Sequence, residues 1–571
     1  MNGHLAIVLH SHLPYVLTHG VWPHGADWLN ECCAETYIPM LDVCYKLVEE
    51  GISPKLTIGL TPILCEQLAD PAFAGAFRTY VDHKIESAVL NADEFKRTGQ
   101  DKRAALAEMW RDYYIGIKRA FEKSYNKSIV GAFKRLQDEG HIEIITCGAT
   151  HGYFPLLHDD SSIDAQIAVG KANYEKHFGR EPIGMWLPEC AYRPGYSWKP
   201  PIAGCENEPA RDRMGVEYYV GKNHIQYFFV DSHLLLGGKA MGTYLARFDA
   251  LKRLWEQIEK EYVPRPQKED LTTLDDYWAG TTSDMTRVAF FTRDPNTGLQ
   301  VWSGEYGYPG APEYLDFHKK HFPGGHRYWR VTGRKVDLGD KQPYDPEPIE
   351  ARLKEQAEHF VGLVAEHLSK APVDEDGRPN VVCAPFDTEL FGHWWFEGPR
   401  WLYHLAKAMH KSEAVSMVTC GEYLHNHPPK TVVDLPEGSW GEGGFHFIWL
   451  NKDTEWTWRH VYRAEATMKH LIAKHGEDGD PMMRRILAQL GRELLLLQSS
   501  DWQFLISTWS ARDYAEQRFM EHDSQFNRLA QIVERYAGSR ALDEGDAAYL
   551  HKCEAIDPVF SELDISVWKA D

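Results

Sequence analysis

The sequence predicts an α/β fold, a parallel barrel or a distorted version of one, that continues into a helical domain. Three observations support this prediction. Short apolar runs without alternation are typical of parallel strands that are buried on both faces. These runs alternate with helical patterns through about residue 420, which favours βαβ units. Polar motifs directly follow several of the runs, where parallel α/β folds place their functional groups.

The chain opens with the apolar run Leu5–Leu9, which ends in the polar stretch HSHLPY, and Pro14 interrupts regular structure there. Similar runs, closed by Gly, Pro or a polar residue, are expected to be the other strands. They lie at residues 55–60, 142–147, 183–187, 216–220, 227–231, 288–291, 300–302, 381–387 and 415–419. The runs 216–220 and 227–231 represent a fifth strand or a pair of strands. About seven runs form the barrel.

Helical patterns fill the intervals between these runs. Apolar residues at helical spacing predict helices over residues 35–51, 63–140, 162–178 and 347–371. From about residue 438 the strands stop. Long amphipathic helices are then expected over residues 455–476, 481–500 and 511–537, as in a helical domain.

The domain organisation follows from these changes of pattern. Residues 232–285 are irregular apart from a charged helix near 249–262, so we expect a lid outside the main core. The expected division is a catalytic barrel over 1–194 and 286–437, an inserted domain or lid over 195–285, and a C-terminal helical domain over 438–571.

The composition narrows the class of partner. The 571 residues carry a formal net charge of −21, which disfavours binding to a nucleic acid backbone. None of the ten cysteines stands in a C-x-x-C pair, so reduced thiols in a cytoplasmic compartment are the simplest account. The N-terminus lacks a basic segment before its short apolar run, so no secretory signal is expected. No apolar run is long enough to span a membrane. The oligomeric state stays open.

Two carboxylates follow expected strands in aromatic surroundings, Glu189 in WLPEC and Asp387 in APFDTE. A pair of carboxyl groups can cleave a glycosidic bond, because one group attacks the anomeric carbon and the other protonates the leaving oxygen. Burial beside aromatic rings raises the pKa of one acid, so that it stays protonated near neutral pH. Helix caps and structural salt bridges are the alternative roles for either residue.

Four histidines also follow strands, namely His10, His12, His151 and His393. An H-x-H pair after the first strand is also how some metal-dependent hydrolases begin, with neutral imidazoles as ligands. In a sugar site, the same side chains would hydrogen-bond hydroxyl groups. Any of the four could instead be a satisfied core residue.

A glycine-rich loop carries two tryptophans, Trp440 and Trp449, nine residues apart. Exposed indoles can stack on sugar rings, although a domain junction packed with tryptophan would have the same composition. A phosphate cradle is disfavoured, because Glu442 stands among the glycines and would repel an anion. No Walker or dinucleotide-binding pattern occurs.

Five ordered motifs carry a family resemblance that spans nearly the whole chain. They are HSHLPY (10–15), ATHGYFP (149–155), MWLPECAY (185–192), APFDTELFGHWWFEG (384–398) and SSDWQFLISTWSARDYAEQR (499–518). The sequence resembles glycoside hydrolase family 57, most of all the α-1,4-glucan branching enzymes of that family.

The resemblance implies a (β/α)7 barrel, a small inserted domain and a C-terminal helical domain. It implies a retaining mechanism without metal or cofactor, with Glu189 as nucleophile and Asp387 as general acid/base. It also implies substrate contacts from residues outside this pair: His10, His151, Trp302, Trp440, Trp449 and Asp501. From their positions after strands, His12 and His393 are expected to contact the substrate as well. Branching members carry a loop tyrosine that favours transfer over hydrolysis. Tyr244 is the nearest match, although an expanded charged segment follows it through about residue 278.

The expected function is therefore cleavage of α-1,4 linkages in an α-glucan and formation of α-1,6 branches. An α-amylase or a 4-α-glucanotransferase would use the same first step with another acceptor. A metal-dependent amide or ester hydrolase that uses His10 and His12 is a more remote alternative, as is a catalytically silent glucan-binding protein.

Overall fold

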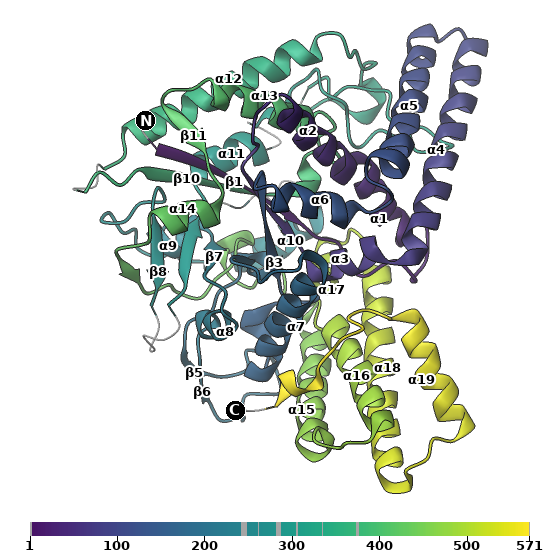
Figure 1. Cartoon of the computed structure of the whole chain (residues 1–571), viewed down its shortest axis with the longest axis vertical. Coiled ribbons are helices and arrows are strands. Elements are labelled where there is room, and N and C mark those ends of the chain that lie inside the picture. Colours follow the sequence, from purple (N-terminus) through teal and green to yellow (C-terminus); the bar gives the residue numbers. More distant parts are fainter. Residues whose placement is uncertain are drawn as a thin grey trace.

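The fold is that of a computed structural model, which describes residues 3–569 except 241, 243–247, 261, 281–286, 304–306, 334 and 373–375. Figure 1 shows a strand-centred body with a bundle of C-terminal helices packed at one end. Two long helices stand along the right-hand edge of the picture, above that bundle.

Seven parallel strands form a distorted barrel, in the spatial order β10, β1, β2, β3, β4, β7, β9. Their bounds are β1 (Gly3–Ser11), β2 (Leu56–Leu60), β3 (Ile142–Cys147), β4 (Met185–Trp186), β7 (Tyr227–Val230), β9 (Ala289–Thr292) and β10 (Asn380–Asp387). A parallel bridge between Gly184 and Tyr227 joins β4 to β7. One main-chain hydrogen bond of 2.9 Å, from Asp294 N–H to the Cys383 carbonyl, links the end of β9 to β10. The strands are almost wholly buried, as continuous apolar runs predict.

Three further strands extend this framework. β11 (Val415–Met417) pairs with the first residues of β1, while β8 (Asp276–Ala279) is antiparallel to β9 and β12 (Val432–Val433) is parallel to β8. A separate antiparallel hairpin is formed by β5 (Tyr196–Trp198) and β6 (Arg211–Arg213).

Helices surround the strands and confirm most of the helical prediction. Those between β1 and β4 are α1 (Ala26–Cys32), α2 (Ile38–Glu49), α3 (Pro62–Ala69), α4 (Pro71–Arg97), α5 (Asp101–Arg119), α6 (Ile129–Asp138) and α7 (Asp160–Phe178). Later in the barrel come α12 (Ile349–Ser369), α13 (Gly398–His410) and α14 (Cys420–Asn426). Helices α4 and α5 are this long pair (Figure 1), and they pack against each other along their length.

The segment Val216–Val220 was expected as a strand and is wrong, because it lies in helix α8 (Val216–Lys222). Its β-branched and aromatic composition suggested a strand. Yet Val216, Tyr219 and Val220 are the buried apolar residues, at the i, i+3, i+4 spacing of one helical face. The neighbouring run, Tyr227–Val230, is a true barrel strand.

The segment 300–302 was also expected as a strand and is wrong. It ends helix α11 (Pro295–Trp302), and the residues read as a turn before it form the first helical turn. The Asp294 side chain caps this helix by accepting a 2.8 Å hydrogen bond from Thr297 N–H, and Pro295 occupies the first position, where its missing N–H has no cost.

The expected inserted region contains the barrel strand β7 as well as the hairpin, α8, α9 (Ser232–Leu236), α10 (Asp249–Ile258) and β8. Downstream, the predicted helices of the C-terminal region are confirmed as α15 (Glu455–His475), α16 (Pro481–Leu497) and α18 (Arg512–Ser539). The sequence prediction missed α17 (Asp501–Thr508) and α19 (Glu544–Ile556). Within the described residues, every helix is too short or too polar to cross a membrane.

Candidate active site

The two predicted carboxylates come from strand ends at the same edge of the barrel. Asp387 is the last residue of β10 and lies beside His10 in the β1–β10 register. Glu189 lies in the short 3-10 turn η4 (Pro188–Cys190) that follows β4. The two are close enough for the charge of Asp387 to raise the pKa of Glu189. Parallel strands deliver their carboxyl ends to one edge, which explains how residues 198 positions apart meet.

Glu189 is held in a strained backbone conformation. Its φ is 61° and ψ 24°, in the left-handed region that a residue with a side chain occupies at a cost of about 1–2 kcal/mol. The loop before η9 (Glu442–Gly444) fixes this conformation. Trp440 N–H donates to the Glu189 carbonyl at 3.1 Å, and Gly438 and Tyr192 exchange two main-chain hydrogen bonds. Main-chain hydrogen bonds from this loop thus hold the strained turn that carries the Glu189 carboxyl group.

The Glu189 carboxylate has two hydrogen-bond donors and a raised pKa. Trp440 Nε1 donates to Oε2 at 2.7 Å, and Ser500 Oγ donates to Oε1 at 3.4 Å. Burial, with the negative charges of Asp387 and Asp501, raises the pKa of Glu189 to about 8 against the lowering effect of these donors. The acidic cluster therefore retains a proton at neutral pH, which is what a pair made of one nucleophile and one proton donor requires.

Three histidines and one aspartate adjoin the carboxylate pair. His10 Nε2 and His151 Nε2 are hydrogen-bonded at 3.0 Å, and His12 Nε2 lies 2.9 Å from Asp501 Oδ2. The rings of His12 and His151 stack with centroids 3.9 Å apart. Burial lowers the pKa values of His10 and His151 well below the ordinary value, so both imidazoles are neutral. Neutral imidazoles can both donate to and accept from sugar hydroxyl groups.

Asp501 reaches this site from the C-terminal region, as the first residue of α17. Burial alone would raise the pKa of Asp501, but His12, His151 and the hydroxyl of Ser499 outweigh it and keep this pKa low. Asp501 therefore contributes a negative charge beside the carboxylate pair.

The predicted tryptophans differ in how they lie relative to Glu189 and to one another. The ring of Trp440 lies 6.4 Å from that of Trp302, edge to face, and 5.1 Å from that of Trp186. Trp302 also adjoins Trp394 at 6.4 Å. Trp449 is completely buried and stacks on Tyr153 at 4.5 Å, where it underlies Gly441. Trp449 therefore supports the Trp440 loop from beneath and presents no open face in this structure.

One predicted contact, His393, is not brought to the carboxylate pair. His393 lies in a separate buried cluster, with its Nδ1 3.6 Å from Glu35 Oε2, and Arg327 pairs with the same carboxylate at 2.8 Å. Tyr244 lies outside the described residues.

Several residues of the site escaped sequence reasoning. Glu389 is buried two positions after Asp387, and burial together with the Asp387 charge raises its pKa to about 8. Arg293 and Asp231 follow β9 and β7 and form a buried bidentate pair at 2.7 and 2.9 Å. The Arg293 guanidinium lies 5.8 Å from the centre of the Trp440 ring. The criterion that found Glu189, a polar residue directly after an apolar run, would also have selected this pair.

The histidine cluster also offers ligand atoms to a metal. Among the described residues, His10, Cys147 and His151 present such atoms within 4.8 Å of one another, as do His12, His151 and Asp501. The same nitrogens already take part in hydrogen bonds, from His10 to His151, from His12 to Asp501 and from His151 Nδ1 to Ser500 Oγ at 2.8 Å. Hydrogen bonding alone thus accounts for their arrangement.

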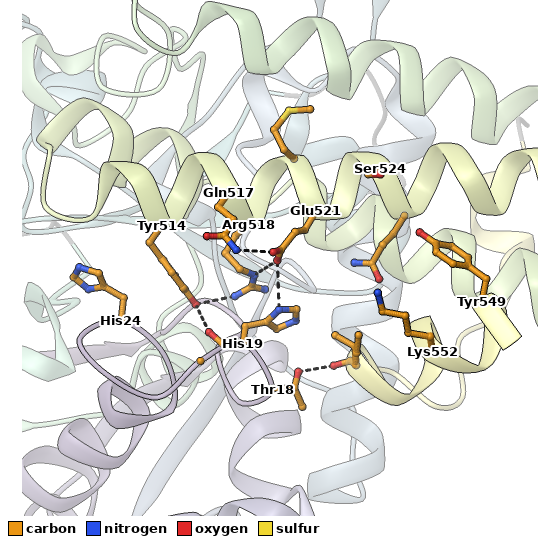
Figure 2. A pocket seen from close by; sticks show the side chains of 14 residues that line it. Thr18, His19, His24, Tyr514, Gln517, Arg518, Glu521, Ser524, Tyr549 and Lys552 are labelled. Atoms are coloured by element: carbon orange, nitrogen blue, oxygen red, sulfur yellow. Dashed lines mark hydrogen bonds and ion pairs between the residues drawn. The ribbon is translucent and has the colours of Figure 1, made fainter.

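A cavity of about 750 Å³ lies between the loop after β1 and helices α18 and α19, and none of the site residues described above lines it (Figure 2). Its polar side chains pair with one another: Arg518 NηH donates to Tyr514 Oη at 2.9 Å, and Gln517 donates to Glu521 at 2.8 Å. His19 Nδ1 lies 3.8 Å from Glu521. The contact of His19 with Glu521 connects the loop that follows His12 to helix α18.

Comparison with known proteins agrees with this geometry. Residues 6–436 match glycosyl hydrolase family 57, and residues 460–568 match the C-terminal family of 1,4-alpha-glucan branching enzymes. A 1,4-alpha-glucan branching enzyme of Thermococcus kodakarensis is 40% identical over 572 aligned residues, which cover 100% of this chain and 79% of that protein.

Two crystal structures share the fold. The branching enzyme of Pyrococcus horikoshii is 40% identical, with a TM-score of 0.87 over 100% of this chain and 97% of that one. The α-amylase AmyC of Thermotoga maritima is 29% identical, with a TM-score of 0.78 over 100% of both chains. The match of most of the chain to a single family, together with the carboxylate pair at its strand ends, shows that this protein belongs to glycosyl hydrolase family 57.

Proposed function

We propose that this protein is a retaining 1,4-α-glucan branching enzyme. The observation that carries the proposal is the carboxylate pair Glu189 and Asp387, delivered from β4 and β10 to one end of the barrel. The similarity of the whole chain, including its C-terminal helices, to branching enzymes supports an α-glucan as the substrate.

In the first chemical step, the Glu189 carboxylate attacks the anomeric carbon of an α-1,4-linked glucose. The bond from that carbon to the glycosidic oxygen breaks, and Asp387 transfers its proton to this oxygen, which leaves as the 4-hydroxyl of the departing chain. A covalent ester between Glu189 and the glucosyl chain remains. Trp440 Nε1–H, 2.7 Å from Oε2, stabilises the nucleophile as an ion before the attack.

In the second step, the 6-hydroxyl of an acceptor glucan attacks the same carbon from the face that the first chain left. Asp387 takes the hydroxyl proton, the ester bond to Glu189 breaks, and an α-1,6 linkage forms with net retention. The neutral His10 and His151, with Asp501, are proposed to hold the sugar hydroxyl groups during both steps.

Transfer requires that an acceptor sugar reaches the ester before water does. We assign this exclusion of water to the Trp302 and Trp440 side chains and to a lid over 232–285. Tyr244 is proposed as the loop tyrosine that favours transfer over hydrolysis. Trp449 supports the Trp440 loop and acts indirectly. The proposed organisation is completed by a barrel over 1–194 and 286–437, to which β7 (Tyr227–Val230) also belongs, and by a helical domain over 438–571. His393, in its separate cluster, would act only on a remote part of the glucan.

A role in glycogen biosynthesis and a cytoplasmic location fit the proposal. All ten cysteines are unpaired, and nine are buried, as in proteins of a reducing compartment.

Debranching analysis tests the proposed function. Amylose incubated with the protein should release new short chains when a debranching enzyme is added, and Glu189→Gln should release none while retaining its circular dichroism spectrum. Amylose that gains no debranchable linkages under any condition would refute the assignment.

Hydrolysis is the second candidate, because an α-amylase shares the fold at a TM-score of 0.78. Water would then be the acceptor in the second step. Branching lowers the iodine staining of amylose with little formation of new reducing sugar. Hydrolysis instead produces new reducing ends in proportion to the loss of iodine staining. Activity that survives exhaustive chelation would exclude the metal-dependent alternative.

A further inference from the structure

We propose that Glu389 is a positioning residue of this site, which acts as a neutral acid by anchoring the end of β1 to the end of β10. The inference rests on the proposed function, because it concerns the same carboxylate pair. It assigns a role to a buried acid that takes no part in the two chemical steps above.

Glu389 connects the two strand ends through one oxygen. It lies in the 3-10 turn η8 (Thr388–Leu390), directly after Asp387, and is 5% exposed. Its Oε1 accepts a hydrogen bond of 2.5 Å from the Tyr37 hydroxyl and one of 3.3 Å from the main-chain N–H of His12. A second connection, 2.7 Å between Ser11 Oγ and Thr388 Oγ1, runs parallel to it.

The anchor continues to the other reactive carboxylate. His12, fixed by Glu389 at its main chain, binds Asp501 Oδ2 through Nε2 at 2.9 Å. Asp501 in turn influences Glu189, because its charge raises the pKa of the nucleophile. Glu389 therefore sets the distance between the general acid/base on one strand and the histidine–aspartate pair on the next.

The surroundings of Glu389 favour its neutral form. Burial, followed by the negative charge of Asp387, raises its pKa to about 8 against the two hydrogen bonds. Cys32 and Tyr37, which also face it, have pKa values raised well above normal by burial and remain neutral. Near neutral pH, Glu389 thus holds His12 without placing a negative charge of its own next to the general acid/base Asp387.

Glutamine is the test of a neutral anchor. Its amide oxygen can accept from Tyr37 and His12, but it carries no ionisable proton. Glu389→Gln should keep kcat within about threefold of wild type at pH 7, while Glu389→Ala should lower kcat on the order of 10-fold or more with little change in KM, because misplaced groups slow the chemical step.

Glu397 provides a matched control. It is buried, its Oε1 accepts from Leu315 N–H at 3.0 Å and the Tyr344 hydroxyl at 2.8 Å, and burial raises its pKa. Glu397→Ala should lower the thermal midpoint as Glu389→Ala does, yet leave kcat unchanged. Should Glu389→Ala fail to fold, Tyr37→Phe removes one donor and should lower kcat by a smaller factor.

Release of fluoride from an α-maltotriosyl fluoride donor is the readout, since both branching and hydrolysis begin with this step. A Glu389→Gln variant as impaired as Glu389→Ala would overturn the neutral anchor, as would an Ala variant with the kcat of wild type. Failure of the proposed function would be seen in the debranching analysis, where the wild-type protein would make no α-1,6 linkages.

Discussion

The indole Nε1 of Trp440 donates a 2.7 Å hydrogen bond to Oε2 of Glu189, and the main-chain N–H of Trp440 donates to the carbonyl of Glu189 at 3.1 Å. One residue of the loop before the C-terminal helices thus holds both the backbone and the side chain of the nucleophile. This double contact explains how a strained glutamate keeps a single orientation, and it sets the first prediction.

Trp440→Phe removes the donor and keeps most of the ring. The pKa of Glu189 should rise, because this hydrogen bond lowers it. The attack needs the carboxylate, so the acid limb of the pH profile of kcat/KM should move to higher pH. A hydrogen bond to a charged group contributes about 1.5–3 kcal/mol, so kcat should fall by about 10- to 150-fold.

Trp278→Phe is the matched control for this change. Its Nε1 donates a 2.8 Å hydrogen bond to the Pro429 carbonyl, away from the carboxylate pair. Its pH profile should coincide with that of wild type, and an equal shift in both variants would assign the effect to general loosening of the fold.

Asp501→Asn should shift the same limb in the opposite direction. The negative charge of Asp501 raises the pKa of Glu189, so its removal makes the carboxylate easier to ionise. The acid limb of kcat/KM should then move to lower pH, even though kcat itself decreases with the loss of a proposed sugar contact. Asp453→Asn, in which a carboxylate 3.5 Å from Arg512 is lost, serves as the control. A profile for Asp501→Asn that superimposes on wild type would contradict the electrostatic coupling.

Asp231→Asn should destabilise the barrel by about 3–5 kcal/mol at pH 7, because it leaves the buried Arg293 without its counter-charge. Burial alone would raise the pKa of Asp231, but Arg293 outweighs it and depresses this pKa below the ordinary value. A depressed carboxyl pKa gives stability above the unfolded pKa of about 4, which is lost as the pH falls through the folded value.

Urea denaturation at several pH values measures this difference. The difference in unfolding free energy between wild type and Asp231→Asn should be largest at pH 7 and should decrease below about pH 4. Glu122→Gln, in an exposed pair with Arg78, should change stability by less than about 1 kcal/mol throughout. If this difference in unfolding free energy stays constant down to pH 2, the contribution of Asp231 comes from packing and not from its charge.

Asp557→Asn should loosen the loop that follows His12. Asp557 is completely buried and accepts a 2.7 Å hydrogen bond from His19 Nε2, which joins this loop to the segment after α19. Loss of the charge should cost about 2–3 kcal/mol and increase proteolytic nicking within residues 16–25. Limited proteolysis followed by mass spectrometry locates the cuts. Glu554→Gln, from an exposed pair with Arg485, should leave the cleavage pattern unchanged.

The sequence predicted the parts of the fold in which local pattern and environment agree. The strands β1, β2, β3 and β10 are buried apolar runs, and their ends carry the motifs of the site. Predictions went wrong where composition and spacing disagreed, as at Val216–Val220, whose strand-like residues form one face of a helix. The helix that ends at Trp302 was missed because Asp294 and Pro295 suit a turn as well as a helical N-terminus.

By itself, the sequence determined that the chain is an α/β barrel with helices to follow, and that Glu189 and Asp387 stand at strand ends. Burial of apolar runs and the direction of parallel strands suffice for both. Only the tertiary structure decided which groups surround the pair. Trp440, Ser500 and Asp501 lie more than 250 positions from Glu189 in the sequence, and Trp449 proved to be buried support. The pKa of Glu189 likewise depends on burial and on charges brought from distant segments, which no local pattern of residues encodes.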